Sequence, residues 1–375
     1  MPEADCGEHP PYPLANRYMI SSSPPNPYQR LRAYLTSHPR VWLVTGAAGF
    51  IGSSLVGELL ALGQLVVGLD NFSTGYQRNL DDVVTGAAAA RFKLIRGDIR
   101  DLDDCRLACD GVDYVLHQAA LGSVPRSIED PITSHEVNVS GFLNVFVAAR
   151  DARVSRVVYA SSSSVYGDST DVPQREDRVG RALSPYAATK KTNEAYAAIM
   201  QRTYGLRSIG LRYFNVFGAR QDPNGAYAAV IPRWVGQLMA GEQCIAYGDG
   251  ETSRDFCYVA NVVQANLLAA AAADASATGD VYNIACGQQT SLNGLFTMLR
   301  AGLSEREPAI GAAHLEHGAP RPGDIRHSVA DITKAQRMIG YCPMYDIARG
   351  LNEALEWYWA SRAPLETMMV CRASV

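Results

Sequence analysis

Residues 41–63 read VWLVTGAAGFIGSSLVGELLALG, and this stretch decides the fold prediction. Its first five residues are an apolar run cut off by glycine, which is the pattern of a short buried strand. Three glycines follow at intervals of three, and residues 50–62 then continue in an apolar pattern typical of a helix. A second apolar run at 65–70 predicts another strand. The order strand, turn, helix, strand is that of a parallel β–α–β unit.

The same alternation continues to about residue 218. Further strands are predicted at 92–98, 113–120, 155–167 and 208–218, with helical stretches between them. We therefore predict an α/β fold, with a Rossmann-like doubly wound parallel sheet and a smaller C-terminal substrate-binding lobe. The predicted boundaries are 1–39 for a partly disordered leader rich in Pro and Ser, 40–217 for the sheet domain, 258–285 for a return to that domain, and 218–257 with 286–375 for the lobe.

The composition is that of an ordinary globular protein. The chain has 375 residues, of which 47% are hydrophobic and 19% charged, and a formal net charge of −4. That balance implies no general attraction to nucleic acid, and no run of 18 apolar residues predicts a membrane span. The 8 cysteines form no C-x-x-C pair and follow no secretory signal, so we expect free thiols, no metal site and a cytoplasmic location.

The glycine turn predicts a binding site for a dinucleotide. Gly46 permits the sharp bend after the strand, Gly49 lets a diphosphate approach the backbone, and Gly52 allows the helix to pack closely on the strand. The diphosphate then lies at the helix N-terminus, where unpaired backbone N–H groups and the helix dipole favour an anion. Glycines in an ordinary loop are the alternative, which the strand–turn–helix order weakens.

The acidic residues that end the next two strands indicate which dinucleotide binds. Asp70 follows Gly46 by 24 residues, and an acid at that position hydrogen-bonds the ribose hydroxyls of NAD and repels the 2′-phosphate of NADP. The next residue is Asn71 rather than an arginine, so NAD is favoured. Asp98 ends the following strand at a position that suits the adenine. A turn cap for Asp70 and a plain strand-end acid for Asp98 are the alternatives.

A tyrosine and a lysine lie one turn apart on a predicted helix in SPYAATKK, residues 184–191. Alone, the pair is equally compatible with a surface helix and a solvated lysine. Together with the glycine turn, the strand-end acid and HQAA at 117–120, it resembles the extended short-chain dehydrogenase/reductase family over about residues 40–360. The resemblance implies that Tyr186 is the acid/base, and that Lys190 binds the nicotinamide ribose and lowers the tyrosine pKa.

The resemblance also assigns the substrate hydroxyl to a serine on the preceding strand. Ser162 is the best candidate in ASSSSVYG, and Ser163 follows closely because four consecutive serines leave the register open. A free tyrosine has a pKa of about 10, so a useful phenolate needs a lowering of about 2–4 pH units, which a neighbouring ammonium and the cationic nicotinamide can supply. The implied cofactor residues are Gly46, Gly49, Phe50, Ile51, Gly52, Asp70, Asn71, Gly75, Asp98, Ile99, Gln118, Ala119, Ala120, Tyr186, Lys190 and Tyr213.

Three long stretches are most similar to bacterial UDP-N-acetylglucosamine 4-epimerases: LGSVPRSI at 121–128, DPNGAYAAVIP at 222–232 and GDGETSRDFCY at 248–258. In nucleotide-sugar members of the family, an asparagine, an arginine and an Arg–Asp pair bind the diphosphate and the uridine ribose, since the guanidinium fork suits phosphate. A turn residue and surface ion pairs are the alternatives. The implied substrate residues are Gly122, Ser123, Ser162, Ser163, Tyr186, Asn215, Ala229, Val230, Trp234, Arg254, Arg321, Asp324 and Ser328.

Ser328 is the residue on which the prediction of the substrate's sugar depends. In the epimerases that the chain resembles, the fourth residue after the aspartate of Arg-x-Gly-Asp lines the sugar pocket near C2, and here that residue is Ser328. Glucose-only epimerases have a bulky tyrosine at this position. A serine therefore implies room for an N-acetyl group, and an exposed loop serine without substrate contact is the alternative.

The residues after Ser162 distinguish between the reactions of the family. Dehydratases place Asp-Glu there, whereas Ser163 and Ser164 follow here, and Asp70 argues against NADPH-dependent reductases. The resemblance thus implies C4 epimerisation of a UDP-hexose, most simply UDP-N-acetylglucosamine, through a 4-keto sugar and bound NADH, with decarboxylation less favoured. UDP-glucuronate or a UDP-N-acetylhexosaminuronate is the alternative substrate, and a non-catalytic NAD-binding regulator is the alternative function. The resemblance further implies a homodimer formed through the helices near 137–150 and from 186 onward.

Overall fold

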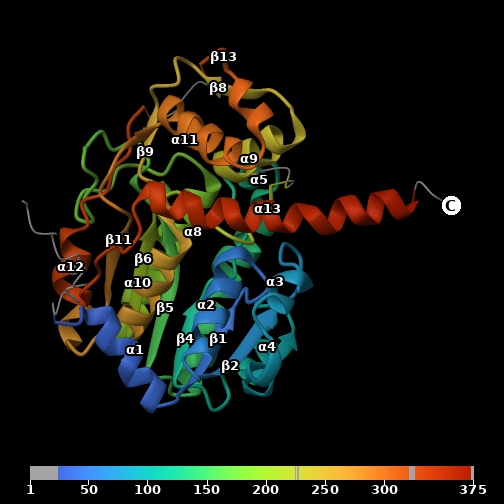
Figure 1. The fold of residues 1–375 in the computed structure, drawn as a ribbon. Helices are drawn as coiled ribbons and strands as arrows, with labels where there is room; N and C mark the ends of the chain where they lie inside the picture. The colour runs from blue at the N-terminus through green and yellow to red at the C-terminus, as the bar shows by residue number, and fades with distance from the viewer. Residues whose placement is uncertain (1–23, 224, 226–227, 321–325, 373–375) are drawn as a thin grey trace, which may run out of the picture.

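A seven-stranded parallel sheet forms the centre of this computed structural model, which describes residues 24–223, 225, 228–320 and 326–372 (Figure 1). The strand order is β11–β6–β5–β4–β1–β2–β3, and all neighbours run parallel. The predicted doubly wound fold is thereby confirmed. The strands are β1 (Val41–Thr45), β2 (Leu65–Asp70), β3 (Phe92–Arg96), β4 (Tyr114–His117), β5 (Arg156–Ser162), β6 (Ser208–Tyr213) and β11 (Asp280–Ile284).

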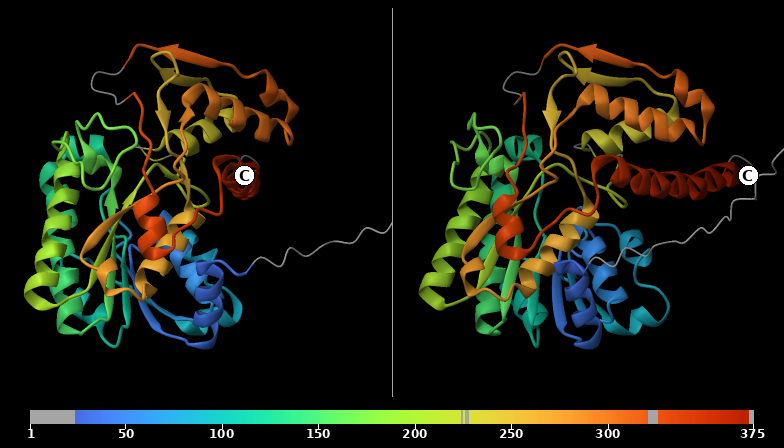
Figure 2. Two further views of the ribbon diagram at one scale, coloured as in Figure 1. Left: turned by 90° about the vertical axis from the view of Figure 1, so that its left-hand side faces the viewer. Right: turned by 60° about the vertical axis from the view of Figure 1, so that its left-hand side comes forward.

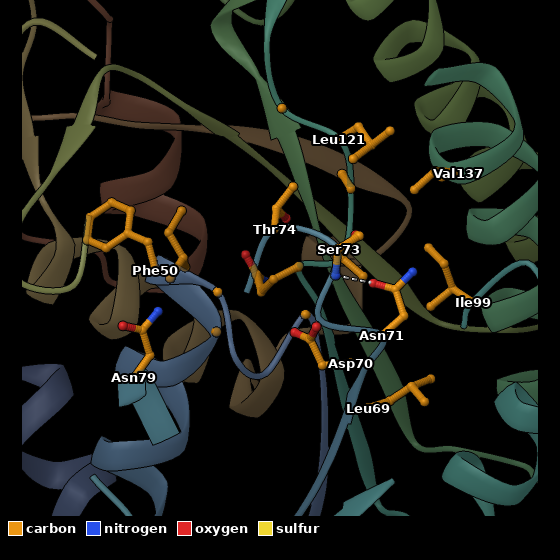
Figure 3. Close-up of a pocket in the computed structure, with 18 of the residues that line it drawn as sticks. Phe50, Leu69, Asp70, Asn71, Ser73, Thr74, Asn79, Ile99, Leu121 and Val137 are labelled. Carbon is orange, nitrogen blue, oxygen red and sulfur yellow. Dashed lines mark hydrogen bonds between the residues drawn. The ribbon is translucent and has the colours of Figure 1, made fainter. Parts of the chain in front are cut away.

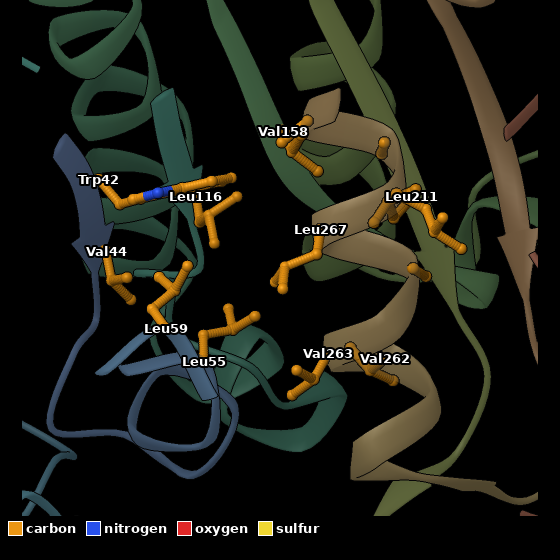
Figure 4. Close-up of a cluster of buried hydrophobic side chains, with 14 of the residues drawn as sticks. Trp42, Val44, Leu55, Leu59, Leu116, Val158, Leu211, Val262, Val263 and Leu267 are labelled. Atoms are coloured by element: carbon orange, nitrogen blue, oxygen red, sulfur yellow. The ribbon is translucent and has the colours of Figure 1, made fainter. Parts of the chain in front are cut away.

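Helices cover both faces of the sheet because the side chains of each strand alternate between the faces. Trp42 and Val44 belong to one hydrophobic core and Leu43 to the other. Figure 4 shows the first core, in which Leu55 and Leu267 reach toward the sheet from two different helices. The covering helices are α2 (Phe50–Ala61) and α10 (Val259–Ala271) on this face, and α4 (Leu102–Cys109), α7 (Phe142–Asp151) and α8 (Pro185–Tyr204) on the other.

The chain reverses its direction across the sheet at β1. It proceeds from β1 to β2 and β3 on one side, and then returns to β4, β5 and β6 on the other. Such a reversal opens a crevice at the carboxyl ends of the central strands, where open α/β sheets bind ligands. The glycine turn follows β1, and HQAA begins with the last residue of β4, so the fold brings these two motifs together.

Four strands are shorter than predicted, because the residues after them leave the sheet and form loops at the crevice. They end at Arg96, His117, Ser162 and Tyr213. After Ser162 the chain turns into a 3₁₀ helix, Ser163–Tyr166, and after Tyr213 it continues to Val216–Phe217, which pairs with another segment.

The second lobe has a hydrophobic core of its own and lies above the sheet in Figure 2. Trp234, Phe296 and Leu355 come from three of its helices and are buried in that core. The lobe contains α9 (Val230–Ala240), α11 (Leu292–Ser304) and α13 (Ile347–Arg372), and the two-stranded pairs β7 (Val216–Phe217) with β10 (Cys257–Tyr258), β9 (Ser253–Arg254) with β12 (Thr290–Ser291), and β8 (Cys244–Tyr247) with β13 (Leu315–Gly318).

Part of the predicted leader is a helix that packs on the sheet domain. Helix α1 (Pro27–Ser37) begins with a capping box, in which the side chain and backbone of Asn26 exchange hydrogen bonds with those of Gln29 at 2.9 Å. Tyr28 and Leu35 are buried in the core below α10. The folded part of the chain therefore begins before residue 40, the predicted boundary.

Shorter helices complete the described fold. They are α3 (Gln77–Asp81), α5 (Val124–Glu129), α6 (Pro131–His135) and α12 (Thr333–Ile339), with 3₁₀ or π turns at Gly86–Arg91, Glu136–Gly141, Ser163–Tyr166, Ala275–Ala277 and Pro308–Ala312. Within the described ranges, none of the helices combines the length and the apolar character that a membrane span requires.

Candidate cofactor and catalytic site

A cavity of about 370 Å³ opens at the crevice between β1 and β4 (Figure 3). The glycine turn, the residues that end or follow β2 and β3, and the segment after β4 form its wall. The predicted cofactor residues that line it are Gly46, Gly49, Phe50, Ile51, Gly52, Asp70, Asn71, Asp98, Ile99, Gln118, Ala119 and Ala120. The other four predicted cofactor residues, Gly75, Tyr186, Lys190 and Tyr213, do not line this cavity.

The glycine turn has the geometry that an anion requires. Gly46 has φ +67°, and a Cβ atom there would lie 2.9 Å from the backbone of Ala119. A Cβ on Gly52 would lie 1.9 Å from the carbonyl oxygen of Gly46, so helix and turn touch through backbone alone. Gly49 is the N-cap of α2 and offers no side-chain acceptor to the first N–H groups. These groups are left for a ligand with negative charge.

The two predicted acids differ in their surroundings. The carboxylate of Asp70 accepts hydrogen bonds from the N–H groups of Ala48 at 2.8 Å and Phe72 at 2.7 Å, while burial raises its pKa. Each carboxylate oxygen still has a lone pair for a ribose hydroxyl. Asp98 instead accepts from the guanidinium of Arg100, which lowers its pKa to about 2. Asp98 is therefore already paired, whereas Asp70 keeps accepting capacity toward the cavity.

Tyr213 and Gly75 do not line the cavity but lie behind the residues that form its wall. The hydroxyl of Tyr213 donates to Oε1 of Gln118 at 3.0 Å and accepts from Nδ2 of Asn266 at 2.9 Å, so it orients a residue that does line the cavity. A Cβ on Gly75 would lie 2.8 Å from the Cβ of Ala48. Glycine there lets the loop after β2 pack on the glycine turn.

Helix α8 carries Tyr186 and Lys190 to the carboxyl end of β5. Ser184 caps the helix by accepting the N–H of Ala187. Lys190 is 4% exposed, and its Nζ donates to the carbonyl of Ala160 at 2.8 Å. The same Nζ lies 5.8 Å from the centre of the Tyr186 ring. The pair thus shares one face of the helix, as the four-residue spacing predicts.

Burial changes the pKa of both groups. It lowers the pKa of the Lys190 ammonium to about 8, and the Glu194 carboxylate acts in the opposite direction. Burial also raises the pKa of Tyr186, and a hydrogen bond with Ser162 opposes this. The expected lowering of the tyrosine pKa is therefore absent from the chain without cofactor. The reason is that Nζ is bonded to a carbonyl of β5, and desolvation of the phenol dominates.

Ser162 is the serine that contacts Tyr186. Its hydroxyl forms the hydrogen bond with that of Tyr186 and accepts from the N–H of Ser164 at 3.1 Å. Ser163, the second candidate, begins the 3₁₀ helix that follows β5. The geometry favours Ser162, which ends the strand beside α8.

An asparagine that sequence reasoning missed joins α8 to the cavity wall. The amide of Asn138 accepts from the N–H of Leu121 at 2.7 Å and donates to the Leu121 carbonyl at 3.1 Å. It also donates to the hydroxyl of Thr189 at 3.3 Å. Leu121 lines the cavity and Thr189 precedes Lys190, so this amide links the cavity wall to the helix that carries the Tyr–Lys pair.

The predicted substrate residues lie at three places. Gly122 lines the cavity, and Ser123 caps the short helix beside it. Arg254 and Ser328 lie on adjoining segments, because the N–H of Ser328 donates to the carbonyl of Ser253 at 3.2 Å. Arg321 and Asp324 lie outside the described residues.

Asn215 lies beside the second of these places, and the predicted residues of α9 make up the third. Asn215 has φ +32°, and its Nδ2 donates to the Asp255 carbonyl at 3.1 Å. Ala229 caps α9 and Val230 begins it. Trp234 is 1% exposed and lies in the lobe core, so its side chain packs the lobe and does not line the described cavity.

Ten lining residues were not selected from the sequence: Leu69, Ser73, Thr74, Tyr76, Asn79, Gly97, Leu121, Val137, Arg220 and Asp222. Asp222 begins the DPNGAYAAVIP stretch, but neither it nor Arg220 belongs to a motif whose spacing predicts a cofactor site. Both come from the loop after β7, far along the chain from the glycine turn, so no local pattern assigns them to this cavity.

Three features suit NAD and a redox reaction at a carbon that bears a hydroxyl. They are the glycine turn with an open helix N-terminus, the strand-end acid that can accept further hydrogen bonds, and the buried Tyr–Lys pair. The sequence matches the NAD dependent epimerase/dehydratase family over residues 42–285. The chain belongs to this family, and both the predicted resemblance and the NAD cofactor are confirmed.

The relatives of the chain include several UDP-sugar 4-epimerases. A UDP-glucose 4-epimerase of Mycolicibacterium smegmatis is 38% identical over 84% of this chain and 97% of its own length. A UDP-N-acetylglucosamine 4-epimerase from Methanobrevibacter ruminantium M1, solved in complex with UDP-N-acetylmuramic acid, is 36% identical with a TM-score of 0.79, over 86% of this chain and 99% of that chain. A UDP-glucuronic acid 4-epimerase from Bacillus cereus was solved with UDP-glucuronic acid and NAD. It is 28% identical with a TM-score of 0.75, over 84% of this chain and 98% of that chain. The predicted enzyme class is thereby confirmed.

Proposed function

We propose that this UDP-sugar 4-epimerase interconverts UDP-N-acetylglucosamine and UDP-N-acetylgalactosamine. The relatives support the inversion of C4 in a UDP-sugar. The observation that carries the reaction is the contact of Ser162 with Tyr186 beside the buried ammonium of Lys190. That arrangement supports a reaction with one proton acceptor and one neighbouring positive charge.

The residues of the chain divide the proton chemistry between them. Tyr186 takes the proton of the C4 hydroxyl, and Ser162 holds that hydroxyl by a hydrogen bond. Lys190 holds the nicotinamide ribose and supplies a positive charge that favours the phenolate. Bound NAD supplies a reversible acceptor for the C4 hydride and a cationic ring. Tyr186 returns the proton after the keto sugar has turned its other face, so the net reaction is neither oxidation nor reduction.

The diphosphate tether about which the sugar turns needs cationic partners. Arg254 is the described candidate, and Asn215 lies on the same side of the lobe, linked to Asp255 by its amide. We assign the remaining contacts with phosphate and uridine ribose to Arg321 and Asp324. Guanidinium groups suit this role because they donate two parallel charge-assisted hydrogen bonds to a phosphate.

Ser328 supports the choice of an N-acetyl sugar. It is 8% exposed, and its hydroxyl donates to Oε1 of Gln174 at 3.2 Å. A tyrosine at this buried position would need space that the serine does not take. Ser328→Tyr should therefore lower kcat/KM for UDP-N-acetylglucosamine by about 5- to 200-fold, the range for overpacking a fitted site, and should spare or raise kcat/KM for UDP-glucose.

The measurement is kcat/KM for both sugars in both proteins. Ser276→Tyr is a matched control, because Ser276 is exposed on a 3₁₀ turn away from the site. If the ratio of the two kcat/KM values is the same in Ser328→Tyr as in the wild type, Ser328 does not determine whether the N-acetyl group is accepted.

A uronic acid is the second candidate substrate, and the similarity to the Bacillus cereus UDP-glucuronic acid 4-epimerase favours it. Incubation with a panel of UDP-sugars, followed by proton NMR of the anomeric signals, separates the candidates. Turnover of a UDP-uronate with no turnover of either neutral sugar would replace the N-acetylhexosamine proposal.

We also propose a homodimer that forms through α7 and α8. Both helices cover the same face of the sheet, and α8 keeps Ile199 45% exposed, with Tyr204 54% exposed at its end. A second copy of the chain would bury these side chains. Light scattering at working concentration tests this, and a monomeric mass contradicts it.

A further inference from the structure

The cofactor cavity contains an unusual balance of charge. NAD carries two negative charges on its diphosphate, yet the cavity wall includes the carboxylates of Asp70 and Asp222, besides that of Asp98, which is paired with Arg100. Among the described residues that line it, Arg220 is the one with a positive charge. The N–H groups at the start of α2 favour an anion, but their partial charges fall short of two full charges.

Arg220 is held at this end of the cavity by hydrogen bonds to two hydroxyls. Its backbone has φ +67°, in the left-handed region, and its Nε and Nη2 donate to the hydroxyls of Ser53 and Ser54, each at 3.0 Å. Both serines lie in the first turns of α2. Within the part of the chain that the structure describes, no carboxylate lies at ion-pair distance from this half-buried guanidinium. Burial lowers the pKa of this guanidinium, and the Asp82 carboxylate, beyond ion-pair distance, acts in the opposite direction. A partly desolvated charge whose hydrogen-bond partners are neutral hydroxyls is well suited to pair with an anion.

The loop that carries Arg220 is fastened at two further points. Oδ2 of Asp222 accepts from the hydroxyl of Tyr76 at 2.7 Å, on the loop before α3. On the other side, the hydroxyl of Tyr358 donates to the carbonyls of Gly218 at 3.3 Å and Gln221 at 3.0 Å. Residues 218–222 therefore connect the lobe helix α13 to two parts of the cofactor wall.

We propose that residues 218–222 form a clasp across the cofactor, in which Arg220 pairs with the dinucleotide diphosphate and the Asp222–Tyr76 hydrogen bond holds the loop closed. Dissociation of NAD then requires the lobe loop to open. The clasp thus keeps the cofactor bound through many turnovers, which a cycle without net oxidation permits. This inference rests on the NAD cofactor and is independent of which sugar the enzyme accepts.

The test is the rate at which NADH leaves the loaded enzyme after mixing with excess NAD, followed by the fluorescence of bound NADH. Arg220→Met should release NADH about 10- to 100-fold faster, the range for losing a charge-assisted hydrogen bond. Tyr76→Phe should release it about 2- to 10-fold faster, since one neutral partner is lost. Added salt should accelerate release from the wild type more than from Arg220→Met, because salt weakens an ion pair.

Arg349→Met is the matched control, because Arg349 is exposed and stacks on Tyr345 outside the cavity. It should release NADH at the wild-type rate. A second measurement separates a contact with the diphosphate from a loosened pocket: titration of cofactor-stripped protein with ADP and with adenosine. Arg220→Met should weaken the binding of ADP and leave the binding of adenosine unchanged. The proposal would be overturned if Arg220→Met released NADH at the wild-type rate, or if it lost affinity for ADP and adenosine equally.

Discussion

Replacing Lys190 by methionine should stabilise the cofactor-free protein at pH 7 and abolish turnover. The ammonium is 4% exposed, and burial lowers its pKa from the usual 10.5 to about 8. At roughly 1.4 kcal/mol for each pH unit, that lowering corresponds to about 3 kcal/mol of destabilisation at pH 7. Methionine removes the charge at similar volume but leaves the Ala160 carbonyl without its partner, which costs about 1 kcal/mol. The net gain in the free energy of unfolding should be about 1–3 kcal/mol.

The sign of the pH dependence follows from the direction of the pKa change. The folded-state pKa of Lys190 is the lower one, so the unfolded chain binds more protons between about pH 8 and 10.5. The stability of the wild type therefore rises, through this residue, as the pH rises across that window. The advantage of Lys190→Met should be complete below about pH 8 and should fade toward pH 10.5.

The assay is urea unfolding of both proteins after removal of NAD, at several pH values across this window, with the slope of the transition as a check on two-state behaviour. Lys191→Met is the control. The neighbouring Lys191 is only partly buried, and its Nζ donates to the carbonyl of Gly180 at 2.6 Å. A Lys190→Met protein that is less stable than the wild type at pH 7, or whose advantage is the same at every pH, would refute the reasoning.

Two further predictions concern the reaction and the glycine turn. Tyr186→Phe should keep the fold and the bound cofactor but lower kcat by at least about 10²–10⁴-fold, since it removes the acid/base. Activity within a few-fold of the wild type in an NMR assay would exclude Tyr186 from the mechanism. Gly52→Ala should lose NAD on purification and unfold more easily by at least about 1–3 kcal/mol, because its Cβ would lie 1.9 Å from a backbone oxygen. Gly57→Ala is its control, since that Cβ meets only the Val83 side chain at 3.1 Å, and normal NAD content in Gly52→Ala would contradict the steric argument.

The amino-acid sequence by itself determined the features that depend on neighbours along the chain. Glycines at intervals of three predict a turn that brings helix and strand into backbone contact, and a spacing of four predicts that Tyr186 and Lys190 share a helical face. The apolar runs predict where the strands lie along the chain, because the inner strands of a parallel sheet are buried on both faces. The structure has the predicted sheet, and the glycine turn and Asp70 line its cavity.

Only the tertiary structure decided the features that depend on residues far apart in the chain. Arg220 and Asp222 reach the cavity from a loop of the second lobe, and Trp234 turns into the lobe core. The pKa of Lys190 is likewise a property of its surroundings, since desolvation is set by every segment that packs around the ammonium. Periodicity records which face of an element is apolar, but it contains no information on which distant element covers that face. The charges that meet in the cofactor cavity therefore follow from packing.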